Sequence, residues 1–251
     1  MEYTILGKTK EKISRIGLGA WQFSEAWGVT EYSQAKAIVA KAIELGVNFF
    51  DTAMVYGMGI SENALGKALR ELNVKRDEVF ITTKIPGDFL NPDDILRSVD
   101  KSIKILGLGY IDGLLAHWPP VWHNYPTYIY ARALEKLVTL GKVRYLGLSN
   151  FPIELVESFR GHLSRVDVEL FQIRYNLVER WAEEAHIPYA EKNCITIQAW
   201  SPIAKGALTG KYTPETLPKF TDVRATDPIF HPKNFEKVWK LVEILKSVSE
   251  K

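Results

Sequence analysis

Residues 79–117 decide the fold, because two short apolar runs frame them: VFITTK at residues 79–84 and IDGLLAH at residues 111–117. Between the runs, Asn91 directly precedes a proline, a favourable arrangement for the first turn of a helix. The apolar residues that follow recur at helical spacing and stop at Gly107, a residue typical of helix ends. The segment therefore predicts a strand, a covering helix and a second strand, which together make one parallel β/α unit.

The same alternation continues in both directions along the chain. The strand candidates are residues 17–18, 47–51, 79–84, 111–117, 143–149, 168–172 and 195–200. Several are apolar on both faces, as expected where helices cover one face and a barrel interior lies on the other. Before the first of these candidates, residues 3–6 and 13–16 predict a small hairpin across the bottom of the barrel. The predicted fold class is α/β: a TIM-type (β/α) barrel with an N-terminal β-hairpin, formed by residues 1–251 as a single domain.

The last part of the sequence predicts an incomplete barrel. Residues 201–232 carry several prolines and little periodicity, and residues 235–245 form a final amphipathic helix with no strand candidate behind it. A TIM barrel closes with eight strands. We therefore expect this barrel to lack the eighth strand and the domain to be incomplete at its C-terminus. Unpaired strand edges favour pairing with another chain, so self-association through the open edges is also expected.

Composition and charge narrow the class of protein. The net charge is only +2, without the concentrated basic face of a nucleic-acid binder. No apolar run approaches the roughly 20 residues that span a bilayer, and the first residues lack the pattern of a signal peptide. The single cysteine, Cys194, excludes an internal disulfide and fits a cytoplasmic location; we expect its side chain to be buried. His123 and His231 have no partner at metal-binding spacing, so no metal site is expected.

Polar side chains stand at the ends of successive predicted strands. They are Asp51, Lys84, His117, Ser149, Asn150, Gln172 and Ser201, with Trp200 beside the last of them. In β/α barrels the functional groups gather at the carboxyl ends of the strands. Polar groups at so many consecutive strand ends indicate a functional site and are hard to explain by packing.

Four residues can form a tuned proton donor: Asp51, Tyr56, Lys84 and His117. A tyrosine ordinarily titrates near ~10, and a neighbouring ammonium, here that of Lys84, would lower this pKa by about 1–3 units by stabilising the phenolate. A lysine in a partly dry site needs a carboxylate partner, which Asp51 supplies. His117 can hydrogen-bond the oxygen atom that reacts.

Taken singly, these residues also have ordinary structural roles. Asp51 and Lys84 could form an ion pair under a barrel rim. Tyr56 alone could pack as an aromatic ring, and His117 alone could be a hydrogen-bonded histidine without a catalytic role. Their joint placement at successive strand ends favours a catalytic site. The glycines within residues 17–19 lack the third glycine of a dinucleotide fingerprint, so a Rossmann fold is not favoured.

Longer motifs carry a resemblance to a known family. They are Asp51-Thr52-Ala53, Tyr56-Gly57, Ser61-Glu62, Lys84, His117-Trp118-Pro119, residues 141–151 (GKVRYLGLSNF), Gln172, Tyr175-Asn176-Leu177, Trp200-Ser201-Pro202 and residues 206–212 (GALTGKY). In this order, and over nearly the whole chain, they resemble the motifs of the aldo-keto reductases.

The resemblance implies an oxidoreductase that reduces aldehydes or ketones to alcohols by hydride transfer from NAD(P)H. Tyr56 would be the proton donor, assisted by Lys84 and Asp51, and His117 would orient the carbonyl group. NADP is the implied cofactor, with NAD as the alternative. The implied cofactor-binding residues are Ala20, Trp21, Asp51, Ser149, Asn150, Gln172, Trp200, Ser201, Pro202, Ile203, Gly206 and Leu208. The implied substrate pocket, for a small carbonyl compound, comprises Trp21, Tyr56, His117, Trp118 and Trp122.

The chain departs from the family pattern after its last helix. The family places an eighth strand there, followed by a loop that holds the adenosine half of the cofactor. Three hypotheses therefore stay open: an active reductase, a cofactor-sensing or scaffold subunit with little turnover, and a truncated, inactive product. The sequence names no particular substrate.

Overall fold

The computed structural model describes residues 1–27, 31–120 and 125–249, and the chain divides into two compact units. Unit 1 comprises Met1–Gln172 and His186–Gln198, and unit 2 comprises Ile173–Ala185 and Ala199–Lys251. Unit 1 contains most of the predicted barrel and the four residues of the predicted proton donor. Unit 2 contains the irregular segment and the final helix.

The strands form a hairpin and one larger sheet. They are β1 (Tyr3–Ile5), β2 (Lys12–Ser14), β3 (Leu18–Gly19), β4 (Phe49–Asp51), β5 (Phe80–Ile85), β6 (Ile111–Ala116), β7 (Val143–Ser149), β8 (Val168–Arg174) and β9 (Thr196–Trp200). Strands β1 and β2 pair antiparallel, whereas β3 to β9 follow one another in chain order in a seven-stranded sheet. Neighbouring strands from β3 to β8 pair in parallel. The prediction of a TIM-type (β/α) arrangement with an N-terminal hairpin is confirmed, and no eighth parallel strand occurs in the described part of the chain.

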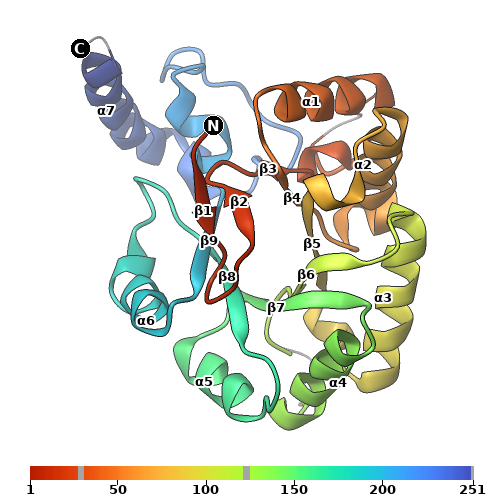
Figure 1. The fold of residues 1–251 in the computed structure, drawn as a ribbon. Helices are drawn as coiled ribbons and strands as arrows, with labels where there is room; N and C mark the ends of the chain where they lie inside the picture. The colour runs from red at the N-terminus through yellow and green to blue at the C-terminus, as the bar shows by residue number, and fades with distance from the viewer. Residues whose placement is uncertain (28–30, 121–124, 250–251) are drawn as a thin grey trace. The chain divides into compact units, whose positions relative to one another are not determined.

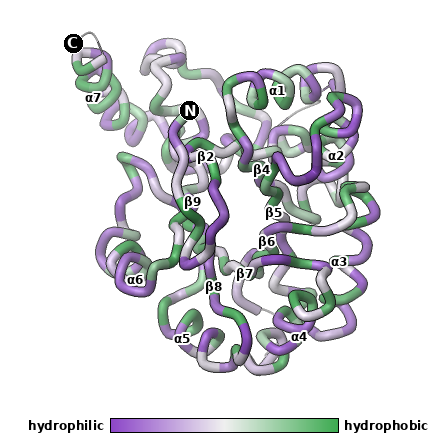
Figure 2. The backbone as a smooth tube through the Cα atoms, viewed as in Figure 1, coloured by the Kyte–Doolittle hydropathy of each residue, from purple (hydrophilic) through white to green (hydrophobic). Residues whose placement is uncertain are grey.

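Helices cover the outer face of the sheet in unit 1 (Figure 1). They are α1 (Tyr32–Glu44), α2 (Ile60–Glu71), α3 (Pro92–Leu106), α4 (Thr127–Thr139), α5 (Ile153–Gly161) and α6 (His186–Asn193). The side chain of Asn91 caps α3 by accepting from two backbone N–H groups, and Gly107 ends it with a φ of 65°. Apolar and polar residues alternate along α3 and α4 (Figure 2), as expected for helices with one face on a sheet.

Strand boundaries differ from the predictions by a few residues. Strand β4 begins at Phe49 and not at residue 47, because the N–H of Val47 bonds the carbonyl of Ala42 and still belongs to the end of α1. Strand β8 continues to Arg174, two residues beyond the predicted end. Alternation of apolar residues locates a strand but does not show where its hydrogen-bond ladder stops.

The hairpin closes one end of the sheet in unit 1. Leu6 and Ile13 are buried in one apolar cluster with Phe49 and Phe80, which are the first residues of β4 and β5. The cluster therefore fills the end where the strands begin. The carboxyl ends of the strands, where the predicted site residues stand, lie away from this apolar closure.

Unit 2 has a small core of its own. Its elements after β9 are the 3₁₀ turns η6 (Ala204–Thr209) and η7 (Pro228–Phe230) and the helix α7 (Pro232–Ser249). Phe230, Phe235 and Val238 belong to its buried cluster. None of the described helices is long and apolar enough to cross a membrane.

Candidate active site

A buried ion pair lies at the carboxyl ends of β4 and β5. Strand β4 ends at Asp51, and the ammonium of Lys84 reaches it with Nζ 2.7 Å from Asp51 Oδ2. The Lys84 side chain is completely buried, and Nζ also donates to the backbone carbonyl of Thr52 at 2.7 Å. Burial opposes the charge and lowers the pKa of Lys84, but Asp51 and then Tyr56 outweigh it, so the net pKa is raised. Lys84 therefore stays a cation at neutral pH.

Tyr56 lies on the other side of this ammonium. Its hydroxyl is 3.3 Å from Lys84 Nζ, and its ring centroid is 4.9 Å from the same atom. The loop that presents Tyr56 bends back sharply, because Gly57 and Met58 both have positive φ, at 63° and 53°. A side chain at position 57 would be strained at this φ and would meet Ile60 Cβ at 3.0 Å, so glycine is favoured there. The loop thus places a phenol beside a buried cation.

The pKa of Tyr56 corrects one expectation from the sequence. We expected Lys84 to lower the phenol pKa below its ordinary value, but the net pKa is raised from 10. Burial is the largest influence and disfavours the phenolate; the positive charge of Lys84 opposes it without cancelling it. Tyr56 therefore holds its proton at neutral pH. The lysine makes the buried phenolate less unfavourable once the proton has left.

His117 completes the group from the end of β6. Its ring centroid lies 5.7 Å from that of Tyr56, with an edge-on angle of 78°. Burial, followed by the nearby positive charge of Lys84, lowers the pKa of His117 to about 3. The imidazole is therefore neutral at physiological pH and can make one hydrogen bond as donor and one as acceptor. The structure thus brings all four residues of the predicted proton donor together in unit 1.

The polar residues at the ends of β7 and β8 join the same network. The backbone N–H of Asn150 donates to the Gln172 carbonyl at 3.0 Å, and Asn150 Nδ2 donates to Ser149 Oγ at 2.9 Å. The Gln172 side chain donates from Nε2 to Asp51 Oδ1 at 2.8 Å. This leaves its amide oxygen as an acceptor. A hydroxyl and two amides at one strand edge match the donors and acceptors that a carboxamide ligand requires.

Two threonines of the network were missed from the sequence. Thr82 Oγ1 donates to Asp51 Oδ1 at 2.7 Å, and the Thr52 carbonyl binds the Lys84 ammonium. Thr82 stands two residues before Lys84 in β5, and residues two apart share a face of a strand. That periodicity could have identified Thr82. A backbone carbonyl such as that of Thr52 leaves no trace in sequence.

The predicted aromatic pocket is described only in part. Trp21 stacks on Tyr56 with centroids 5.8 Å apart and 27° between the planes. Ala20, just before it, is buried, and its N–H donates to the Asp51 carbonyl at 2.7 Å. Trp118 is exposed over 48% of its surface. Trp122 lies outside the described residues.

The other predicted cofactor-binding residues belong to unit 2. They are Trp200, Ser201, Pro202, Ile203, Gly206 and Leu208. The guanidinium of Arg174 lies 5.2 Å from the Trp200 ring centroid, and it is held by Asp227 at 2.9 Å. Asp227 also pairs with Lys205 at 2.8 Å. The Trp200 ring is therefore fixed from one side by a cation that is itself anchored.

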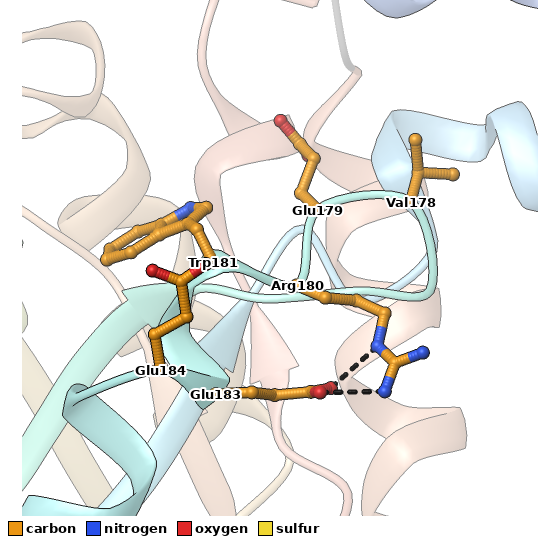
Figure 3. Close-up of a pocket in the computed structure, with 6 residues that line it drawn as sticks. All are labelled: Val178, Glu179, Arg180, Trp181, Glu183 and Glu184. Atoms are coloured by element: carbon orange, nitrogen blue, oxygen red, sulfur yellow. Dashed lines mark hydrogen bonds and ion pairs between the residues drawn. The ribbon is translucent and has the colours of Figure 1, made fainter.

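An open depression of about 670 Å³ lies in the loop that follows β8 (Figure 3). Its lining residues are Val178, Glu179, Arg180, Trp181, Glu183 and Glu184. The two carboxylate oxygens of Glu183 pair with the Arg180 guanidinium at 2.7 and 2.8 Å. No predicted site residue lines this depression, so the polar network of unit 1 remains the candidate active site.

Two further expectations concern cysteine and metal ions. Cys194 is exposed, contrary to our expectation. It lies in the turn after α6, with a positive φ of 53°, and not in the strand. Among the residues that the structure describes, no cluster of three or more His, Cys, Asp or Glu side chains is placed to hold a metal ion.

The described residues combine a parallel β/α sheet with an Asp, Tyr, Lys and His group at the carboxyl ends of its strands. Comparison with known proteins gives the family. The sequence model of the Aldo/keto reductase family matches residues 15–251, and the chain belongs to this family of NAD(P)H-dependent oxidoreductases.

Individual relatives agree with this assignment. The aldo-keto reductase YhdN of Bacillus subtilis (strain 168) is 35% identical over 100% of this chain and 76% of its own length. The glycerol dehydrogenase of Gluconobacter oxydans has a similar structure, with a TM-score of 0.86 and 31% identity over 99% of this chain and 78% of that one. A probable voltage-gated potassium channel subunit beta of Arabidopsis thaliana is 33% identical over 87% of this chain and 69% of its own length.

Proposed function

We propose that this chain reduces a small aldehyde or ketone to the alcohol, with Tyr56 as the proton donor and NADP as the preferred cofactor. The observation that carries the proposal is the position of the fully buried Lys84 ammonium, 3.3 Å from the Tyr56 hydroxyl and 2.7 Å from Asp51. A neutral phenol beside a fixed cation can release its proton to an oxygen that is gaining negative charge.

The site residues divide the reaction between them. A nicotinamide cofactor, when bound, would supply the hydride for the carbonyl carbon. Tyr56 Oη gives its proton to the carbonyl oxygen, and Lys84, held by Asp51, stabilises the phenolate that remains until it takes up a proton from water. Neutral His117 hydrogen-bonds the carbonyl oxygen and holds the substrate in line with Tyr56.

Ser149, Asn150 and Gln172 would hold the carboxamide of the nicotinamide. The hydroxyl and the two amide groups that these residues bring together at the ends of β7 and β8 support this placement. In unit 2, Trp200 and residues 201–211 stay residues that the sequence predicts to bind the cofactor. NAD is the alternative cofactor.

Replacing Tyr56 with Phe tests the proposal. This change removes one hydroxyl and keeps the ring that stacks on Trp21. We expect kcat to fall by about 10²- to 10⁴-fold, the usual contribution of a general acid, while cofactor affinity, followed by quenching of tryptophan fluorescence, stays within a few-fold. Residual turnover near the wild-type rate would contradict the assignment of Tyr56.

A cofactor-sensing or scaffold subunit is the second candidate, favoured by the similarity to the plant channel subunit. Titration of the wild-type chain with NADPH separates the two. Quenching at micromolar cofactor without turnover on any carbonyl compound would favour the sensor. Absence of quenching at millimolar cofactor would exclude the reductase. A cytoplasmic location and self-association through open strand edges stay predictions from the sequence.

A further inference from the structure

A pair of buried hydroxyl groups, from Thr52 and Ser61, lies beside the four site residues but takes no part in the proposed reaction. Both residues are fully buried, and their side-chain oxygens are 2.8 Å apart. Ser61 Oγ donates to the carbonyl of Ala20 at 2.7 Å. A hydroxyl carries one hydrogen. Ser61 therefore uses its own on Ala20, and Thr52 is the donor to Ser61.

The pair holds two segments that contact the proton donor. On one side, the backbone carbonyl of Thr52 accepts from Lys84 Nζ at 2.7 Å. On the other side, Ala20 leads directly into Trp21, which stacks on the Tyr56 ring. One hydroxyl, that of Ser61, thus links the group that holds the ammonium with the ring that supports the phenol.

Ser61 is well anchored for such a role. It lies in the first turn of α2. Helix α2 packs closely on α3, because a Cβ added at Gly66 of α2 would lie 2.1 Å from the carbonyl oxygen of Leu106 of α3. A helix packed this closely cannot shift easily. The bonds from Ser61 therefore fix the two loops to a rigid element.

We propose that Ser61, acting through Thr52 and Ala20, is a positioning residue that sets the distance between Lys84 Nζ and Tyr56 Oη. This inference rests on the proposed function, in which that distance governs proton release. Without the Ser61 hydroxyl, the Thr52 hydroxyl and the Ala20 carbonyl lose their partner in a buried place, and both segments must move to find new ones. Lys84 then moves away from the phenol, which makes the phenolate less stable.

Ser61→Ala is the direct test, and Ser14→Ala is its matched control. Ser14 is also a buried serine that joins two segments: it donates to the Ile16 carbonyl at 2.8 Å and accepts from the Asn48 N–H at 3.2 Å. It belongs to the hairpin, at the opposite end of the strands. We expect Ser61→Ala to lower kcat about ten- to hundredfold, the scale of a small misplacement, with a smaller change in KM. Ser14→Ala should leave kcat unchanged.

The pH dependence separates positioning from general loss of structure. Activity requires protonated Tyr56, so kcat falls as pH rises through the Tyr56 pKa. With Lys84 farther away, this pKa rises, and the alkaline limb of the profile moves to higher pH in Ser61→Ala. Thr52→Val, which keeps the Ser61–Ala20 bond, should shift the limb in the same direction by less. Thr52→Ser, which keeps the hydroxyl, should restore the wild-type profile.

A titration without substrate makes the outcome independent of turnover. Each variant is titrated to alkaline pH together with the same variant carrying Tyr56→Phe. The difference between the two absorbances gives the tyrosinate signal of residue 56. If the wild-type chain shows no turnover, the proposed function fails, and a higher Tyr56 midpoint in Ser61→Ala still supports the positioning role. If Ser61→Ala does not fold, Thr52→Val carries the test. An unchanged midpoint in the folded variants, or an equal shift in Ser14→Ala, overturns the inference.

Discussion

The buried ion pair of Asp51 and Lys84 makes a quantitative prediction about stability. Asp51→Asn keeps the shape of the side chain and an oxygen that can accept from Thr82 and Gln172. It removes the charge that faces Lys84, whose side chain is fully buried, whereas that of Asp51 is 13% exposed. The variant therefore isolates the cost of leaving one ammonium buried without a counter-charge.

The expected loss is about 3–5 kcal/mol of unfolding free energy at neutral pH, as for other buried pairs that lose one partner. A matched surface pair gives the comparison. Lys142 and Asp100 also form an ion pair, but their side chains are 34% and 55% exposed. Asp100→Asn should therefore cost only about 0–1 kcal/mol.

The loss should shrink as the pH rises. In the wild-type chain the pKa of Lys84 is raised above its unfolded value, because Asp51 and Tyr56 outweigh burial. The stability from Lys84 is thus present below the unfolded pKa and is lost as pH rises through the folded one. In Asp51→Asn, burial acts with much less opposition and lowers that pKa. The free energy of unfolding of the variant is then reduced at neutral pH, and it recovers as the pH rises toward about 10.5.

Urea unfolding of the wild-type chain, Asp51→Asn and Asp100→Asn, each at about pH 7 and pH 9.5, measures both effects. The difference between Asp51→Asn and the wild type should be largest at the lower pH. A loss below about 1 kcal/mol, or an equal loss at both pH values, would refute the argument that Asp51 maintains the charge of Lys84.

Two further predictions concern acid stability and helix packing. Burial, followed by the charge of Lys84, holds the pKa of His117 at about 3. The contribution of His117 to the free energy of unfolding is therefore complete above pH ~6.5 and falls by about 1.4 kcal/mol per pH unit as the pH drops toward 3. His117→Gln should flatten this slope in urea unfolding at stepped pH; an unchanged slope would count against a buried, neutral imidazole. Gly66→Ala should cost more than about 3 kcal/mol, because its Cβ would meet backbone of α3 at 2.1 Å. Gly161→Ala, with nothing within 4 Å, should be neutral or stabilising, and thermal melting of both variants checks this contrast.

The strand ends explain why so much of the site could be predicted. A short apolar run followed by a polar residue, as in FFD at residues 49–51, marks a parallel strand and its carboxyl end together. Because the strands pair in chain order, residues at successive ends become neighbours. Asp51, Lys84 and His117 were found in this way.

Other features depended on contacts that local patterns do not encode. The net pKa of Tyr56 follows from its burial, which exceeds the effect of the nearby Lys84. Thr52 acts through its backbone carbonyl, and every residue has one, so no residue type marks this role. The exposure of Cys194 follows from the turn at the end of α6, which places it outside the strand.

The sequence by itself determined the order of the β/α units, the hairpin, the polar groups at the strand ends and the family. Periodicity and residue type are local properties, and a regular parallel sheet converts them into neighbours in space. Only the tertiary structure decided the protonation states of Tyr56 and His117 and the link from Ser61 through Thr52 to the ammonium. These depend on burial and on distances of a few ångströms between segments far apart in the chain, where electrostatic energies change steeply.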